Sequence, residues 1–157
     1  MAAGKWKLYD LAKLRIGNLT IDLSDTTNWK MALFTSASNC NTLSVGTGLY
    51  GDLTNEVANG NGYTTGGVAV ASQSWTNSSG TETWTMANGL WTASGAGITA
   101  RYAVIYKNAT VNTIVKPLMA VCLLDTTPQD VVCSAGNNLT VQINASGVFT
   151  LSGATAD

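Results

Sequence analysis

The chain has 157 residues, of which eight are basic and nine acidic, so its formal net charge at pH 7 is −1. This length predicts one domain, and the balanced charge indicates neither a nucleic-acid nor a membrane-surface partner. Only 11% of the residues are charged, under half the usual share of about 25%, so the surface is either simply sparse in charge or covered in an assembly.

The first residues predict a short amphipathic helix. Leu8, Leu11 and Leu14 recur at every third position, and Gly17-Asn18 would end the helix. Half of the basic residues lie in this segment. We therefore expect residues 1–18 to form an N-terminal helical arm, which either lies over one end of a sheet or docks on a neighbouring subunit.

The remainder, residues 19–157, predicts an antiparallel β domain. Residues 29–35 alternate large apolar side chains with smaller or polar ones, as a strand does. Residues 36–67 are poor in large apolar groups and predict a long polar loop, which is often functional or bound to a partner in a domain of this size. Leu53 and Val57 would anchor that loop to the core.

From Val68 onward, short alternating runs are separated by turn residues. Asn88-Gly89 predicts a tight hairpin turn, and residues 144–147 predict a last hairpin. Strands are expected at residues 68–75, 81–86, 90–93, 98–107, 118–124, 130–133, 139–144 and 148–151. This spacing is typical of a mainly β protein, an antiparallel β-sandwich or barrel-like domain, here with a short N-terminal helix.

Residues 98–107 predict the central strand of the sheet. The segment alternates over ten residues and contains no glycine or proline. Its second side also becomes apolar in the middle, at Ala103 and Ile105. A strand that is apolar on both faces is usually covered on both faces.

Catalytic and metal-binding patterns are weak in this sequence. Histidine is absent, which excludes Ser-His-Asp and Cys-His catalytic arrangements and most zinc sites. Asp52 and Glu56 are the carboxylates most easily brought close together, as a glycosidase would need, although solvated loop charges or local caps are the interpretation that we favour. We predict no catalytic residues, no cofactor and no metal.

Three of the five tryptophans, Trp75, Trp84 and Trp91, fall within 17 residues of one another. Exposed on one face of paired strands, they would form an aromatic platform of the kind that binds sugars. Buried, they would belong to the core, which is the interpretation we favour because large aromatic side chains dominate core energetics.

The three cysteines form no Cys-x-x-Cys pair, so neither a disulfide framework nor a zinc site is expected. Cys122 and Cys133 follow apolar residues and are expected to be buried. Cys40, within Ser-Asn-Cys-Asn, is expected to be exposed and available for an intermolecular bond. The residues that we expect at an interface with other subunits are Trp6, Lys7, Tyr9 and Cys40.

Several separated blocks resemble, in order and approximate spacing, those of a family of tailed-bacteriophage virion structural proteins. They are Asp-Leu-Thr-Asn-Glu-Val at residues 52–57, Gly-Tyr-Thr-Thr-Gly-Gly at 62–67, Thr-Ala-Arg-Tyr-Ala-Val-Ile-Tyr-Lys at 99–107 and Gln-Ile-Asn-Ala-Ser-Gly at 142–147. The chain departs from that family in residues 36–48 and in its cysteines.

This resemblance implies a virion protein without enzymatic activity, most simply a capsid decoration (cement) protein that binds the major capsid protein or another virion protein and forms a homo-oligomer. The alternative is a tail- or fibre-associated protein that contacts a host glycan. The implied location is the virion, assembled in the host bacterial cytoplasm. Since the chain shows neither a secretion signal nor a stretch of about 18 apolar residues, we expect no export and no membrane partner.

Overall fold

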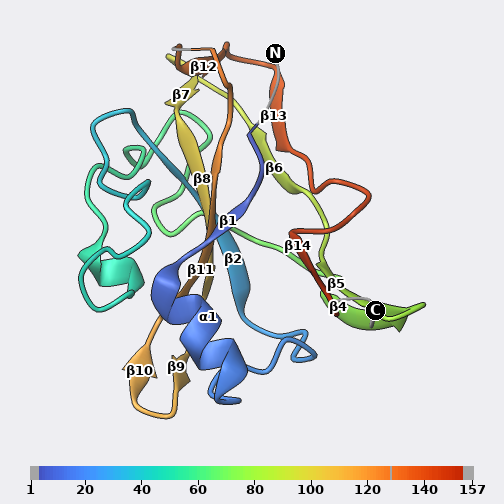
Figure 1. Cartoon of the computed structure of the whole chain (residues 1–157). Coiled ribbons are helices and arrows are strands. Elements are labelled where there is room, and N and C mark those ends of the chain that lie inside the picture. The colour runs from blue at the N-terminus through green and yellow to red at the C-terminus, as the bar shows by residue number, and fades with distance from the viewer. Residues whose placement is uncertain (1–3, 128, 154–157) are drawn as a thin grey trace.

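A computed structural model describes residues 4–127 and 129–153 of the chain. They form a mainly β structure with antiparallel sheets and one short helix (Figure 1), as the sequence predicts. No sheet closes on itself among these residues. No helix within them is both long and apolar enough to cross a membrane.

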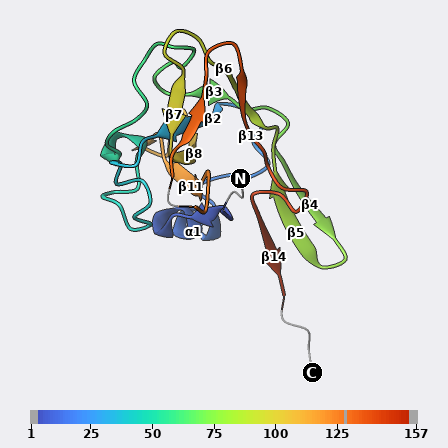
Figure 2. The same ribbon diagram turned by 90° about the horizontal axis from the view of Figure 1, so that it is seen from above.

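The principal sheet has five antiparallel strands. In spatial order they are β1 (Lys7–Leu8), β11 (Leu118–Leu123), β8 (Tyr102–Lys107), β2 (Trp29–Phe34) and β3 (Val68–Ala69). The middle strand, β8, is almost entirely buried. The long loop 36–67 covers one face of this sheet and the smaller sheets cover the other (Figures 1 and 2), so the predicted two-sided cover of the central strand is confirmed.

The smaller sheets supply the second layer. They pair β7 (Ile98–Ala100) with β12 (Val131–Cys133), β6 (Gly89–Thr92) with β13 (Asn138–Val141), and β5 (Thr81–Thr85) with both β4 (Ser74–Ser78) and β14 (Phe149–Ser152). Between the layers, the ring of Trp84 packs edge-on against Trp29 with centroids 4.9 Å apart. The indole N–H of Trp84 donates to the carbonyl of Leu23 at 3.2 Å, so the one polar atom of this buried side chain has a hydrogen-bond partner.

The predicted strand at residues 98–107 is interrupted at Arg101 and changes sheet there. Residues before Arg101 pair with β12, whereas those after it enter the principal sheet. The Arg101 N–H donates to the carbonyl of Phe34 at 2.7 Å, and its carbonyl accepts from the N–H of Leu124 at 3.0 Å. The backbone of Arg101 thus joins both neighbouring strands at the point where the chain bends.

The two predicted hairpins are wrong in their strand pairing. Asn88-Gly89 does not turn β5 back on β6, because β5 pairs with β4 and β14 while β6 pairs with β13. Instead, the Asn88 side chain accepts a hydrogen bond from the N–H of Ile143 at 2.9 Å. The turn at residues 144–147 is present, since the Gly147 N–H donates to the carbonyl of Asn144. The strands on either side of it pair with other strands, residues 138–141 with β6 and residues 149–152 with β5. A short hairpin, β9 (Thr110–Val111) with β10 (Ile114–Val115), lies at the base of the principal sheet in Figure 1.

The N-terminal segment differs from the predicted arm. Lys7 and Leu8 form an edge strand on β11, and the helix α1 (Asp10–Gly17) begins only after it. The expected leucine stripe is not buried: Leu14 is 60% exposed, whereas Arg15 turns inward and donates to the carbonyl of Gly48 at 2.7 Å. Strand pairing, this guanidinium and the buried side chains of Tyr9 and Ala12 attach the segment to the body.

The loop 36–67 contains one 3₁₀ turn, η1 (Tyr50–Asp52), and packs Leu53 and Val57 against the core as expected. It rejoins the sheet at Gly67, which has a φ of +69°. A β-carbon there would lie 1.9 Å from the carbonyl oxygen of Met31. Only glycine permits both this backbone conformation and this close approach.

Candidate functional site

The carboxylate of Asp52 holds together the loop in which it lies. It accepts hydrogen bonds from the backbone N–H groups of Thr47 at 2.7 Å and Leu49 at 2.9 Å, and from the Thr47 hydroxyl at 3.1 Å. These donors, with the Leu49 N–H first, lower the pKa of Asp52. An anion stabilised in this way is a poor proton donor and is not positioned as a free base.

Glu56 is enclosed by a different set of donors. One carboxylate oxygen accepts from the Tyr63 hydroxyl at 2.5 Å and from the Gly66 N–H at 2.7 Å, and the other accepts from the Tyr50 hydroxyl. Burial, followed by the hydrogen bond to Glu56, raises the pKa of both tyrosines. The ring of Tyr50 stacks on Tyr106 with centroids 4.3 Å apart.

Asp52 and Glu56 therefore serve separate hydrogen-bond networks. The Asp52 network closes the loop on itself. The Glu56 network also ties the loop to the principal sheet, because the Tyr63 hydroxyl accepts from the N–H of Leu33 at 3.0 Å and Tyr50 stacks on Tyr106. The simpler interpretation of these residues, as local caps, agrees with their contacts. Among the described residues no group of carboxylates and thiols is placed to hold a metal ion.

The tryptophans do not form the aromatic platform. Trp84 and Trp91 are buried in the core, as favoured. Trp75 alone of the three keeps part of its ring at the surface, where it packs against Phe149 with centroids 5.7 Å apart.

Two of the four expected interface residues are buried within the chain. Cys40 is 0% exposed, so the prediction of an exposed thiol is wrong, and burial raises its pKa to about 11. Its carbonyl accepts a hydrogen bond of 2.6 Å from the hydroxyl of Tyr9, which is also buried. The polar neighbours of Cys40 form the surface, while its own side chain points inward beneath them.

The other two expected residues, Trp6 and Lys7, lie at or beside a groove in the described structure. Lys7 is exposed on β1, which among the described strands pairs with β11 alone and so has no strand on its outer edge. Trp6 is half-buried and lines the groove next to Lys5. Their alternation, Lys5-Trp6-Lys7-Leu8, is the pattern of an edge strand carrying lysines, and it was the available signal for a strand here instead of a helix.

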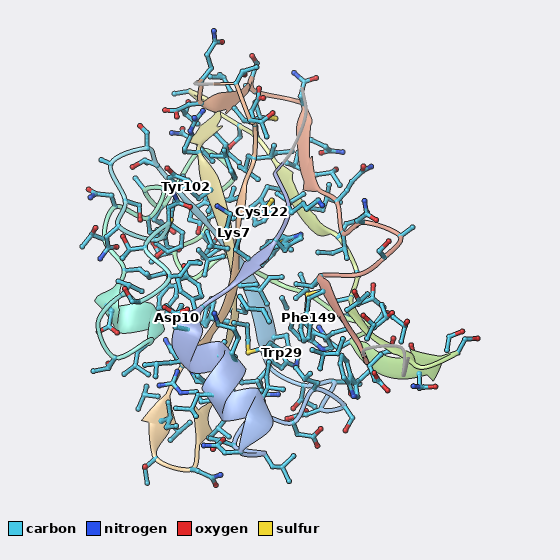
Figure 3. All side chains as sticks on the ribbon, in the orientation of Figure 1. Lys7, Asp10, Trp29, Tyr102, Cys122 and Phe149 are labelled. Carbon is cyan, nitrogen blue, oxygen red and sulfur yellow. The ribbon has the colours of Figure 1, made fainter. Side chains whose placement is uncertain are left out.

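We call this groove the terminal groove, because the N-terminal segment forms one wall and the C-terminal segment the other. It has a volume of about 1000 Å³. Cys122 of β11 lines the groove beside the N-terminal segment, and Phe149 lies in the second wall; both residues are labelled in Figure 3. Ile143 and Val148 add apolar surface to the second wall.

The charge of the terminal groove is one-sided. Lys5 is the one charged residue among the described residues that line it, and no carboxylate does so. Lys7 adds a second positive charge at the adjacent edge. A groove lined by both apolar and polar side chains, with a free strand edge and positive charge beside it, can bind an extended segment of another chain through backbone hydrogen bonds.

Comparison of the chain with models of known protein families, with curated proteins and with solved structures finds no match.

Proposed function

We propose that this chain is a structural protein of a bacteriophage virion, a capsid decoration protein that binds the major capsid protein and stabilises its lattice. The sequence blocks that resemble virion proteins support this proposal, as does the low share of charged residues. The observation that carries it is the terminal groove with its free strand edge, which offers a coat subunit a partly apolar surface and two lysines, Lys5 and Lys7.

The mechanism is mechanical. Many copies, each held on the lattice by a modest contact, bridge neighbouring coat subunits, and simultaneous engagement raises the effective affinity far above that of one contact. A protein in this role needs a body that does not deform. The networks around Asp52 and Glu56, which fix the long loop against the sheet, supply that stiffness.

Binding to capsids stripped of the protein tests the contact. Replacing Lys7 with glutamine removes one exposed charge beside the terminal groove and should weaken binding and its dependence on salt. The matched control is Lys13→Gln, which removes an exposed charge from α1, where Lys13 pairs with Asp10 at 2.8 Å. Equal loss from both variants, or from neither, would remove the terminal groove from the proposal.

The alternative, a tail-associated protein that contacts a host glycan, has less support in the side chains. Of the tryptophans considered for it, only Trp75 keeps exposed ring surface. Quenching of tryptophan fluorescence by host surface polysaccharide, lost in Trp75→Ala, would favour that alternative. Unchanged fluorescence would leave the capsid as the proposed site of binding.

A further inference from the structure

The terminal groove runs along an open edge of β13. Leu139, Thr140 and Val141 all line it, although the side chains of successive residues in a strand point to opposite faces. A groove that meets consecutive residues of a strand lies along the edge of that strand. Among the described strands, β13 pairs with β6 alone, so a further strand has room to pair on its other side.

The backbone of Thr140 faces this open edge. In an antiparallel pair, residues that bond to the neighbouring strand alternate with residues whose N–H and C=O point away from it. The Ala93 N–H donates to the carbonyl of Asn137 at 2.9 Å, and the register of β13 on β6 continues this pairing as far as Val141. Counting in twos from Asn137, Leu139 and Val141 bond to β6, whereas the N–H and C=O of Thr140 point away from it.

The two strand edges beside the terminal groove differ in how well they are protected. On the N-terminal side, β1 carries Lys7, and Lys5 lies two residues before it. Lysines on an edge hinder its pairing with another chain. The sequence of β13, Asn-Leu-Thr-Val, contains neither a charged residue nor a proline. An added strand therefore pairs more readily with β13, and the N-terminal segment forms the wall opposite it.

The side chains of the terminal groove indicate what this added strand carries. Trp6 and Phe149, which are half-buried in the two walls, offer apolar surface. Lys5 is exposed and belongs to neither of the two ion pairs among the described residues. A carboxylate on the added strand gives this ammonium a partner, whereas a cation would be repelled. A second copy of the chain, paired through the same edge about a two-fold axis, would bring two lysine-bearing walls together.

We propose that the terminal groove binds an extended acidic segment of the major capsid protein. The segment pairs with the open edge of β13 as one strand added to the β6–β13 sheet, and it sets a carboxylate beside Lys5. It lies between β13 and the N-terminal segment. This inference rests on the proposed function, because the capsid supplies the segment.

Cross-linking with a carbodiimide, which joins a lysine amine directly to an adjacent carboxylate, identifies the partner. The full chain is bound to capsids stripped of the protein, treated with the reagent and digested for mass spectrometry. Lys5 should be found joined to an aspartate or a glutamate of the major capsid protein. Lys13 and Asp10, 2.8 Å apart on α1, are the internal control, because their link shows that the reagent has reacted.

The outcomes separate this inference from the function on which it rests. A Lys13–Asp10 link without a link from Lys5 to the capsid protein overturns the inference, and a link from Lys5 to a second copy of the chain does so as well. In both cases the chain still binds the capsid through another surface. A chain that does not bind stripped capsids at all contradicts the proposed function itself.

The strand edge is tested at Thr140. Thr140→Pro removes the outward N–H, and proline is tolerated where the N–H of an edge strand points away from its sheet. This variant should bind capsids at least about fivefold more weakly, because the added strand loses a hydrogen bond. Thr140→Val, the control, keeps the N–H and the branched shape and should bind within about twofold of the unaltered chain. Equal binding by the two variants refutes the pairing with β13.

Lys5→Glu tests the charge without altering β13. It places a carboxylate opposite the proposed carboxylate and should weaken binding at least about tenfold at low salt, with a smaller effect at high salt. The Tm of each variant shows whether it has folded, and this second variant provides the test if Thr140→Pro does not fold. Unchanged binding by folded Lys5→Glu excludes an acidic segment from the terminal groove.

Discussion

Replacing Glu56 with glutamine should destabilise the fold without changing its shape. The carboxylate accepts three hydrogen bonds, from the hydroxyls of Tyr50 and Tyr63 and from the N–H of Gly66. An amide of the same size keeps one acceptor oxygen, but it presents an NH₂ group where the second oxygen stood. The Tyr50 hydroxyl then has to turn and accept a hydrogen bond from this NH₂ group, and the acceptor of the remaining hydrogen bonds is no longer charged.

The magnitude follows from those bonds. A hydrogen bond to a charged group contributes about 1.5–3 kcal/mol, and Glu56→Gln exchanges charged bonds for neutral ones while retaining some of their energy. We expect a loss of about 2 kcal/mol in the free energy of unfolding, which for a chain of this size corresponds to about 4–8 °C in Tm. Urea denaturation followed by tryptophan fluorescence measures it directly.

Glu82→Gln is the matched control. Glu82 lies on β5 and accepts one exposed hydrogen bond of 2.6 Å from Asn77, so the same chemical change should cost under about 0.5 kcal/mol. If Glu56→Gln cost no more than Glu82→Gln, the assignment of Glu56 to a structural network would be refuted. A stable Glu56→Gln variant that lost a measurable hydrolytic activity would instead point to catalysis.

Three further predictions concern the body of the protein. Its stability should fall as pH drops from about 4 to about 2, because the Lys107 ammonium lowers the pKa of Asp25 from 3.8 to about 2. The stabilisation from this pair is complete above the higher pKa and is lost as the pH falls through the lower one. The fall should be smaller in Asp25→Asn, and an unchanged pH profile in that variant would contradict this prediction. Cys40 should react with a thiol reagent only as fast as the chain unfolds, and rapid labelling of the folded protein would show that its burial is wrong. Gly67→Ala should lower the free energy of unfolding, measured in urea, by at least about 3 kcal/mol, because it adds a backbone clash to the strain of a positive φ. Gly80→Ala, at a φ of +78° with open space around it, should lower it by about 1 kcal/mol. Similar losses from the two variants would show that the clash does not contribute.

The sequence predicted individual strands better than it predicted their partners. Alternation over residues 98–107 located a strand that is almost entirely buried, because a strand covered on both faces has apolar residues on both faces. It could not locate the interruption at Arg101, which has no local cause: the backbone there bonds to Phe34 and Leu124, which are distant in the sequence. The Asn88-Gly89 signal failed for a related reason, since long-range pairing of β6 with β13 outweighed a local turn preference.

The candidate sites were predictable only in part. Trp6 and Lys7 were named from the sequence, but the terminal groove beside them exists because residues 4–6 lie opposite residues 139–150, and no local sequence pattern shows that. Cys40 was misplaced because its polar neighbours are exposed while its own side chain lies under Tyr9.

The most direct test of the proposed function is whether purified virions of a phage whose genome encodes this chain contain the protein, in what amount and at which position. Quantitative mass spectrometry should find it at a copy number close to that of the major capsid protein, and imaging of the particles should place it on the outer surface of the capsid. Its absence from the particles, or its presence in only a few copies at the tail, would contradict the account.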